Sequence, residues 1–332
     1  MKSLAIIGAG SWGTALAIVL APRFEQIRLW AYESDLADRI RETRQNDVYL
    51  PGFSVSEKTF ISNNLQEVLS GVELVLSVVP SHLVRSLYEQ MLPWLKPEML
   101  FVSATKGLEL KTLLRPSEII DEVISPRFKP RITVLSGPTF AHEVAALNPT
   151  AIVISSADRS GAQCVQAGLA GPNFRLYTSD DPIGVEIGGS IKNVVAIGAG
   201  VLEGLGLGHN PMAALITRGL AEMTRLAVAL GGQARTLAGL AGLGDLVLTC
   251  TGGLSRNRTV GVELARGRKL DEIVGSMKMV AEGIKTTTAA VELARRCSVE
   301  MPITEQMYQM LHHGLDPKEA IRRLMERTLK GE

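Results

Sequence analysis

The chain has few cysteines and histidines, and this scarcity excludes several classes of protein. Its three cysteines, at positions 164, 250 and 297, are widely spaced and form no Cys-x-x-Cys motif. An odd, sparse count favours reduced thiols in a cytoplasmic protein over a disulfide framework. The neighbouring His312 and His313 would point to different faces of a helix, and metal-ligand spacing is absent elsewhere, so we expect no metal.

The chain also lacks an excess of charge of either sign. It has 35 Lys and Arg against 34 Asp and Glu, a net charge of +1, so the overall charge does not indicate a nucleic-acid partner. No low-complexity or acidic tract suggests disorder, and 46% of the residues are hydrophobic, which is typical of a globular protein. The sequence is long enough for two domains.

Long apolar runs are missing as well. No stretch offers about 18 consecutive apolar residues, because Glu203 and Arg218 interrupt the most hydrophobic region. The uncharged segment Ser3–Pro22 could be a secretory signal or an anchor, but it has three glycines within six residues. These would cost a helix roughly 1 kcal/mol each relative to alanine. We therefore expect no integral membrane association, and we expect this segment to stay on the mature protein.

Short apolar runs alternate with amphipathic stretches, such as 34–43 and 83–92, through the first half of the chain. The runs are β-branched and nearly continuous, as parallel strands covered on both faces should be. Strands that alternate with helices predict an α/β fold with a Rossmann-like, doubly wound parallel sheet. The expected strands are Leu4–Ile7, Ile27–Ala31, Leu74–Val79, Leu100–Ala104, Ile132–Leu135 and Ala151–Ile154.

The pattern changes at Asp181 and Pro182, which together suit the start of a helix. Beyond them, strand-like runs almost disappear. We therefore expect a dinucleotide-binding domain over residues 1–182 and an all-α C-terminal domain over residues 183–332. The expected helices of the second domain are Ile183–Leu202, Met212–Leu230, Val260–Ala265, Thr286–Arg296 and Pro317–Leu329.

A glycine-rich turn follows the first expected strand. Gly8, Gly10 and Gly13 have the spacing G-x-G-x-x-G, and a helical run begins at Thr14. In dinucleotide-binding folds the first glycine permits the tight turn, the second lets the backbone approach the pyrophosphate, and the third lets helix and strand pack closely. Glu33 lies 20 residues after Gly13, where a ribose-binding acid is expected. The alternative is that the glycines serve packing alone.

Polar residues at strand ends and in apolar helices are candidates for catalysis. Lys106 ends a strand, where it could meet an anionic substrate or be a solvated loop lysine. Lys192 stands among apolar residues, so it must reach solvent or be held in a cleft, where a desolvated lysine can exchange a proton near neutral pH. Asp245 could cap a helix or orient a lysine. Ser255–Asn257 could bind a phosphate at a helix start, or be an ordinary cap with an exposed arginine.

Together these stretches resemble the bacterial NAD(P)-dependent glycerol-3-phosphate dehydrogenases over essentially the whole chain. The resemblance implies a Rossmann-like domain followed by an all-helical domain, and a cytoplasmic homodimer. It also implies reduction of dihydroxyacetone phosphate to sn-glycerol 3-phosphate for phospholipid synthesis, with NAD or NADP and no metal. The motifs that carry it are IGAGSWGTALA, SATKGLE, SGPTFAHEVA, IKNVVAIGAG, LITRGLAEM, AGLGDLVLTCTGGLSRNR, VAEGIKT and EMPITEQMYQML.

The resemblance also implies roles for individual residues. Lys192 would accept the proton in alcohol oxidation and donate it in the reverse direction. The implied substrate contacts are Lys106, Gly137, Thr139, Lys192, Asp245, Ser255, Arg256 and Asn257. With the glycines of the turn, the implied cofactor contacts are Gly8, Gly10, Ser11, Trp12, Gly13, Tyr32, Lys106, Ala141, Arg256, Val280 and Glu282.

One position departs from the family pattern and leaves the cofactor preference open. Related enzymes often have a basic or imidazole side chain after the second strand, which suits the 2′-phosphate of NADP, whereas this chain has Tyr32 and Glu33. Two other functions also remain open. A β-hydroxyacid dehydrogenase-type reductase would not need the phosphate site of the GGLSRNR stretch, and a non-catalytic dinucleotide sensor would not need Lys192.

Overall fold

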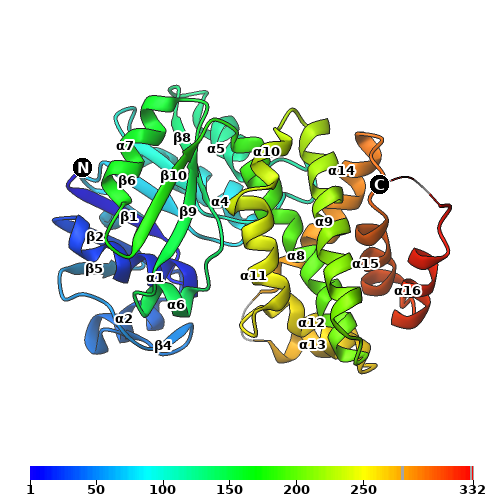
Figure 1. The fold of residues 1–332 in the computed structure, drawn as a ribbon. Helices are drawn as coiled ribbons and strands as arrows, with labels where there is room; N and C mark the ends of the chain where they lie inside the picture. Colours follow the sequence, from blue (N-terminus) through cyan, green and yellow to red (C-terminus); the bar gives the residue numbers. More distant parts are fainter. Residues whose placement is uncertain (278–279, 330, 332) are drawn as a thin grey trace. The chain divides into compact units, whose positions relative to one another are not determined.

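The structure is a computed structural model that describes residues 1–277, 280–329 and 331 (Figure 1). It divides into two compact units. Unit 1 comprises Met1–Lys106 and Leu114–Glu186, and unit 2 comprises Gly107–Leu113 and Ile187–Glu332. The last division falls a few residues beyond position 182, because helix α8 (Pro182–Gly204) begins in unit 1 and continues into unit 2.

Unit 1 is built on an eight-stranded sheet with the order β10-β9-β8-β7-β6-β1-β2-β5. All six expected strands are confirmed, and β5 and β10 are additional. Strand β10 alternates buried and exposed residues along its first half, because successive side chains point to opposite faces and one of its faces is exposed. It therefore lacks the continuous apolar run of the central strands. The strands are β1 (Ser3–Ile7), β2 (Gln26–Trp30), β5 (Thr59–Ser62), β6 (Leu74–Ser77), β7 (Leu100–Ser103), β8 (Arg131–Ser136), β9 (Thr150–Ser155) and β10 (Phe174–Ser179). A separate pair consists of β3 (Gln45–Asn46) and β4 (Leu50–Ser54).

The expectation of a wholly parallel sheet is wrong at one pairing. Strand β9 runs antiparallel to β8, and β10 is parallel to β9. The connection from β8 to β9 contains only the short helix α6 (Ala141–Ala145), which packs against α1 (Ser11–Leu20). A parallel crossover needs a helix that returns the chain to the end of the sheet where the previous strand began. No such helix is present here, so β9 starts at the end of the sheet where β8 finishes and runs in the opposite direction.

The two faces of the sheet are covered by different helices, as in a doubly wound fold. Leu4 and Ile6 of β1 belong to one hydrophobic core and Ala5 and Ile7 to the other, because successive side chains of a strand point to opposite faces. The first core is covered by α1, α2 (Ser34–Thr43), α6 and α7 (Arg159–Leu169). The second is covered by α3 (Leu65–Leu69), α4 (Val84–Met91) and α5 (Pro116–Ile124).

The helices of unit 2 are joined by loops, and its described residues contain no strand, as expected (Figure 1). Helix α8 is long and apolar enough to cross a membrane by length and composition, but its apolar window is completely buried inside the protein. A Cβ on Gly200 of this helix would lie 1.9 Å from the carbonyl oxygen of Arg258, so α8 and α12 are in backbone contact. The other helices are α9 (His209–Ala229), α10 (Ala234–Leu237), α11 (Asp245–Thr251), α12 (Arg256–Ala265), α13 (Leu270–Ser276), α14 (Glu282–Arg296), α15 (Pro302–His313) and α16 (Pro317–Met325).

Candidate active site

The glycine turn joins β1 to α1, as the sequence predicts. Gly8 has a φ of +120°, a conformation that side chains with a Cβ rarely adopt. A Cβ on Gly13 would lie 1.8 Å from the carbonyl oxygen of Gly8, so the turn and the helix are in direct backbone contact. A Cβ on Gly10 would have no neighbour within 4 Å. Gly10 caps α1 without a side-chain hydrogen bond, so open space lies beside a helix N-terminus, an arrangement that fits the pyrophosphate of a dinucleotide.

Asn46, which the sequence analysis missed, braces this turn from a distant segment. Its side-chain nitrogen donates to the carbonyl oxygen of Ala9 at 2.7 Å and to the hydroxyl of Thr14 at 2.8 Å. Asn46 is completely buried. The contact joins residues that are far apart in the chain, so no local sequence pattern predicts it.

The other cofactor residues expected in unit 1 follow the carboxyl ends of strands, as the glycine turn does. Ser11 and Trp12 form the first turn of α1, and the buried indole nitrogen of Trp12 has no hydrogen-bond partner among the described residues. Tyr32 follows β2 and is 77% exposed, with its ring edge-on to Trp30. Ala141 is the first residue of α6, which packs against α1.

Three of the expected substrate residues come together at the ends of β7 and β8. The Lys106 ammonium donates to the carbonyl oxygen of Gly137 at 3.2 Å, and the Thr139 hydroxyl donates to the same oxygen at 3.1 Å. Lys106 is half-buried. The carboxyl ends of strands are where open α/β sheets bind ligands, so this cluster is placed to present a cation and a hydroxyl.

Lys192 lies on α8 and is buried, with an exposed fraction of 5%. Its ammonium donates to the carboxylate of Asp245 and, at 2.9 Å, to the hydroxyl of Thr249. Asp245 is fully buried and begins α11. Of the two alternatives for Asp245, the structure therefore shows a carboxylate that orients a lysine.

Thr249 is a residue of this cluster that the sequence analysis missed. It lies one helical turn after Asp245, so both side chains project from the same face of α11. The i, i+4 spacing from Asp245 is the signal that could have found it. Gly188 allows this arrangement, because a Cβ there would lie 2.5 Å from the carbonyl oxygen of Ala241, just before α11.

The stretch Ser255–Asn257 begins α12 and is tied to two other helices. The Ser255 hydroxyl caps the helix by accepting from the backbone N–H of Arg258 at 3.3 Å. The buried Asn257 side chain donates to the side-chain oxygen of Asn193 at 3.0 Å and accepts from the N–H of Gly283 at 2.9 Å. Asn193 follows Lys192 directly on α8, so the helix that holds the lysine also fixes the start of α12.

The remaining expected cofactor residues of unit 2 lie beside Arg256. Its exposed guanidinium donates to the carbonyl oxygen of Val280 at 3.0 Å, and Glu282 is the first residue of α14. Within the described ranges, no group of three or more His, Cys, Asp or Glu could hold a metal ion.

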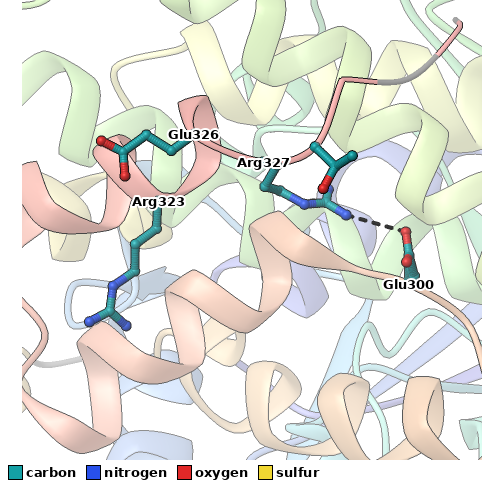
Figure 2. Close-up of a pocket in the computed structure, with 5 residues that line it drawn as sticks. Glu300, Arg323, Glu326 and Arg327 are labelled. Atoms are coloured by element: carbon teal, nitrogen blue, oxygen red, sulfur yellow. Dashed lines mark hydrogen bonds and ion pairs between the residues drawn. The ribbon is translucent and has the colours of Figure 1, made fainter.

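A separate pocket of unit 2 lies among charged residues near α16 (Figure 2). None of the expected site residues lines it. Arg327 pairs with Glu300 at 3.2 Å, and Arg323 pairs with Glu319 at 2.8 Å. Cations and carboxylates are balanced there, and we assign this pocket no part in the reaction. Its lining residues are Glu300, Arg323, Glu326, Arg327 and Thr328.

A doubly wound sheet with a glycine turn, together with a helical unit that buries a lysine against a carboxylate, is the architecture of a dinucleotide-dependent oxidoreductase. Family models agree with this class. Residues 3–162 match the N-terminus of NAD-dependent glycerol-3-phosphate dehydrogenase, and residues 181–322 match the C-terminus of the same family. The chain belongs to the NAD-dependent glycerol-3-phosphate dehydrogenase family.

Individual relatives are similar over almost the whole chain. A glycerol-3-phosphate dehydrogenase [NAD(P)+] of Koribacter versatilis is 57% identical, over 98% of both chains. The enzyme of the same name from Geobacter sulfurreducens is 50% identical, over 100% of this chain and 99% of the relative. The crystal structure of glycerol-3-phosphate dehydrogenase from Coxiella burnetii superposes with a TM-score of 0.94 at 42% identity, over 98% of this chain and 99% of that one.

Proposed function

We propose that Lys192 moves the proton in the reaction of this family, the NAD(P)+-dependent interconversion of sn-glycerol 3-phosphate and dihydroxyacetone phosphate. The protein has NAD(P)+-dependent glycerol-3-phosphate dehydrogenase activity. The observation that carries the role of Lys192 is its buried contact with Asp245 and Thr249. These two partners orient the ammonium, and an ammonium is a proton donor that a substrate oxygen can accept from.

The chemistry at Lys192 follows from the charge that develops on the substrate. When dihydroxyacetone phosphate is reduced at C2, negative charge builds on the carbonyl oxygen, and a buried ammonium stabilises that charge and donates its proton to the oxygen. In the reverse direction the neutral amine accepts the proton of the alcohol. A bound dinucleotide supplies the hydride, or accepts it in the reverse direction, at its nicotinamide.

We assign phosphate binding to the start of α12. The backbone N–H groups of a helix N-terminus and the guanidinium of Arg256 suit an anion, and the Asn193–Asn257–Gly283 network supports this helix start. Contacts of Lys106, Gly137, Thr139 and Ser255 with the substrate belong to the same proposal. Energy from binding the phosphate would orient the carbon that reacts.

We assign dinucleotide binding to the glycine turn. Gly8, Gly10 and Gly13 would admit the pyrophosphate, and Ser11, Trp12, Tyr32 and Ala141 would contact the dinucleotide. Lys106, Arg256, Val280 and Glu282 complete the expected cofactor contacts. We further propose a cytoplasmic homodimer that supplies glycerol 3-phosphate for phospholipid synthesis. Light scattering of the purified protein tests the dimer, which requires twice the mass of the 35.7 kDa chain.

Phosphate dependence tests the substrate. With NADH or NADPH as the reductant, we expect turnover of dihydroxyacetone phosphate and a kcat/KM at least about 100-fold lower for unphosphorylated dihydroxyacetone, because the energy of phosphate binding is lost. The measurement follows the absorbance of the reduced dinucleotide. Comparable values of kcat/KM for the two ketones would favour a reductase without a phosphate site. Binding of the dinucleotide without turnover of either ketone would favour a dinucleotide sensor.

Arg256→Ala tests the phosphate site. Loss of a charge-assisted hydrogen bond worth about 1.5–3 kcal/mol should raise the KM for dihydroxyacetone phosphate at least about tenfold, with a smaller loss of dinucleotide affinity. Arg266→Ala is the control, because Arg266 follows the other end of α12 and pairs with Glu263. An unchanged KM in Arg256→Ala would remove this residue from the phosphate site.

A further inference from the structure

A carboxylate and a phenol form a pair beside the glycine turn. Glu33 follows β2, precedes α2 as its N-terminal cap residue, and is exposed. The Tyr49 hydroxyl donates to Glu33 Oε1 at 3.0 Å. One carboxylate oxygen is thus oriented by the phenol, and the second oxygen, Oε2, is not used in this hydrogen bond.

Tyr49 is held by the residue that also braces the glycine turn. Its backbone N–H donates to the side-chain oxygen of Asn46 at 3.0 Å, and the nitrogen of the same Asn46 side chain donates to Ala9 and Thr14. The segment 46–49 therefore links the expected pyrophosphate turn to the expected ribose acid. Tyr49 is half-buried, so this geometry is supported by packing as well as by hydrogen bonds.

The charged residues nearest to Glu33 in the sequence are acidic. Residues 29–38 include Glu33, Asp35 and Asp38 and contain no Lys or Arg. Burial raises the pKa of the Tyr49 phenol, and its hydrogen bond to Glu33 and the nearby charges of Glu33 and Asp35 raise it further.

The arginines that follow these acids in the chain have carboxylate partners of their own. Arg41 pairs with Asp38 at 2.7 Å and Arg44 with Glu57 at 3.0 Å. Arg39 lies 3.7 Å from Asp47. A phosphate group of charge roughly −2 would meet like charge at this position.

We propose that Glu33, positioned by Tyr49, makes this protein selective for NAD(H) over NADP(H). The carboxylate accepts a hydrogen bond from the ribose 2′-hydroxyl, and it repels a phosphate esterified to that hydroxyl. Tyr49 is a positioning residue, because it acts on the ribose through Glu33. The inference rests on the proposed binding of a dinucleotide at the glycine turn.

The experiment measures equilibrium binding of NADH and NADPH by titration calorimetry, without substrate. We expect wild type to bind NADH at least about tenfold more tightly than NADPH, on the scale of one hydrogen bond to a charged group. Glu33→Gln should weaken NADH binding about tenfold and strengthen NADPH binding, because the charge is gone. Tyr49→Phe should weaken NADH binding by about two- to tenfold with little change for NADPH.

Glu42→Gln is the matched control, because it removes the same charge from the last turns of α2, away from Glu33. Its ratio of NADH to NADPH affinity should equal that of wild type. Higher ionic strength should lower the ratio of NADH affinity to NADPH affinity in wild type more than in Glu33→Gln, since salt screens the repulsion between the carboxylate and the 2′-phosphate. A purely structural role for Glu33 would not produce that difference.

Two results would overturn the inference. Equal affinities of wild type for both dinucleotides, or an unchanged ratio in Glu33→Gln with a native melting temperature, would remove Glu33 as the selector and leave dinucleotide binding intact. Binding of neither dinucleotide would overturn the proposed role of the glycine turn itself, and the inference with it.

Discussion

Replacing Lys192 with methionine should lower kcat at least about 100-fold and leave the dissociation constant for NADH nearly unchanged, the scale expected when a general acid–base group is removed. Methionine has a similar length and no proton to exchange. Steady-state kinetics with dihydroxyacetone phosphate and a separate NADH titration measure the two effects. Near wild-type turnover would eliminate Lys192 as the group that moves the proton.

The buried carboxylate of Asp245 complicates this variant. Lys192 is its partner, and breaking a buried ion pair by removing one member costs about 3–5 kcal/mol, because the other charge stays buried. Lys192→Met/Asp245→Asn removes both charges, so it should recover thermal stability relative to Lys192→Met while remaining inactive. Recovery of activity together with stability would show that the lysine is needed for folding alone.

Lys192→Arg separates charge from proton transfer. A guanidinium keeps the positive charge beside Asp245 but cannot release a proton at any ordinary pH. We expect a folded variant with turnover close to that of Lys192→Met. High turnover by Lys192→Arg would mean that charge stabilisation, rather than proton transfer, is the contribution of this residue.

Gly13→Ala should lower the free energy of unfolding by about 3 kcal/mol, the upper part of the usual range for overpacking. The added Cβ would lie 1.8 Å from the carbonyl oxygen of Gly8, so either the turn or α1 must shift. Alanine is otherwise the better helix former by about 1 kcal/mol, so a loss of stability identifies the clash as its cause. Urea unfolding measures the change.

Gly10→Ala is the matched control in the same turn. Unlike Gly13→Ala, it should change NADH affinity and leave the free energy of unfolding almost unchanged. Its Cβ would meet nothing within 4 Å and the backbone φ is −71°, so stability should be almost unchanged. The methyl group would occupy the open space beside the start of α1, and NADH affinity should fall about tenfold as phosphate hydrogen bonds are lost. Unaltered NADH binding in Gly10→Ala would contradict pyrophosphate binding at this turn.

The features that could be predicted are those whose signals are local. Strands such as Leu100–Ser103 are nearly continuous apolar runs. The helix start at Asp181 and Pro182 depends on adjacent residues, because the Asp181 carboxylate accepts a hydrogen bond from the N–H of Gly184 at 2.8 Å. Strand β10 was missed because one of its faces is exposed. The antiparallel direction of β9 was missed because it depends on the connection from β8, which contains only the short helix α6. The apolar pattern of a strand does not indicate its direction.

The sequence by itself determined the α/β and all-α halves, the glycine turn and the identity of the buried lysine, because each depends on neighbouring residues or on a motif. Only the tertiary structure decided which groups these residues meet. Lys192 pairs with Asp245 and Thr249, and Glu33 is held by Tyr49. Those contacts join segments that are distant in the chain, and they form only when packed helices and strands bring the segments together.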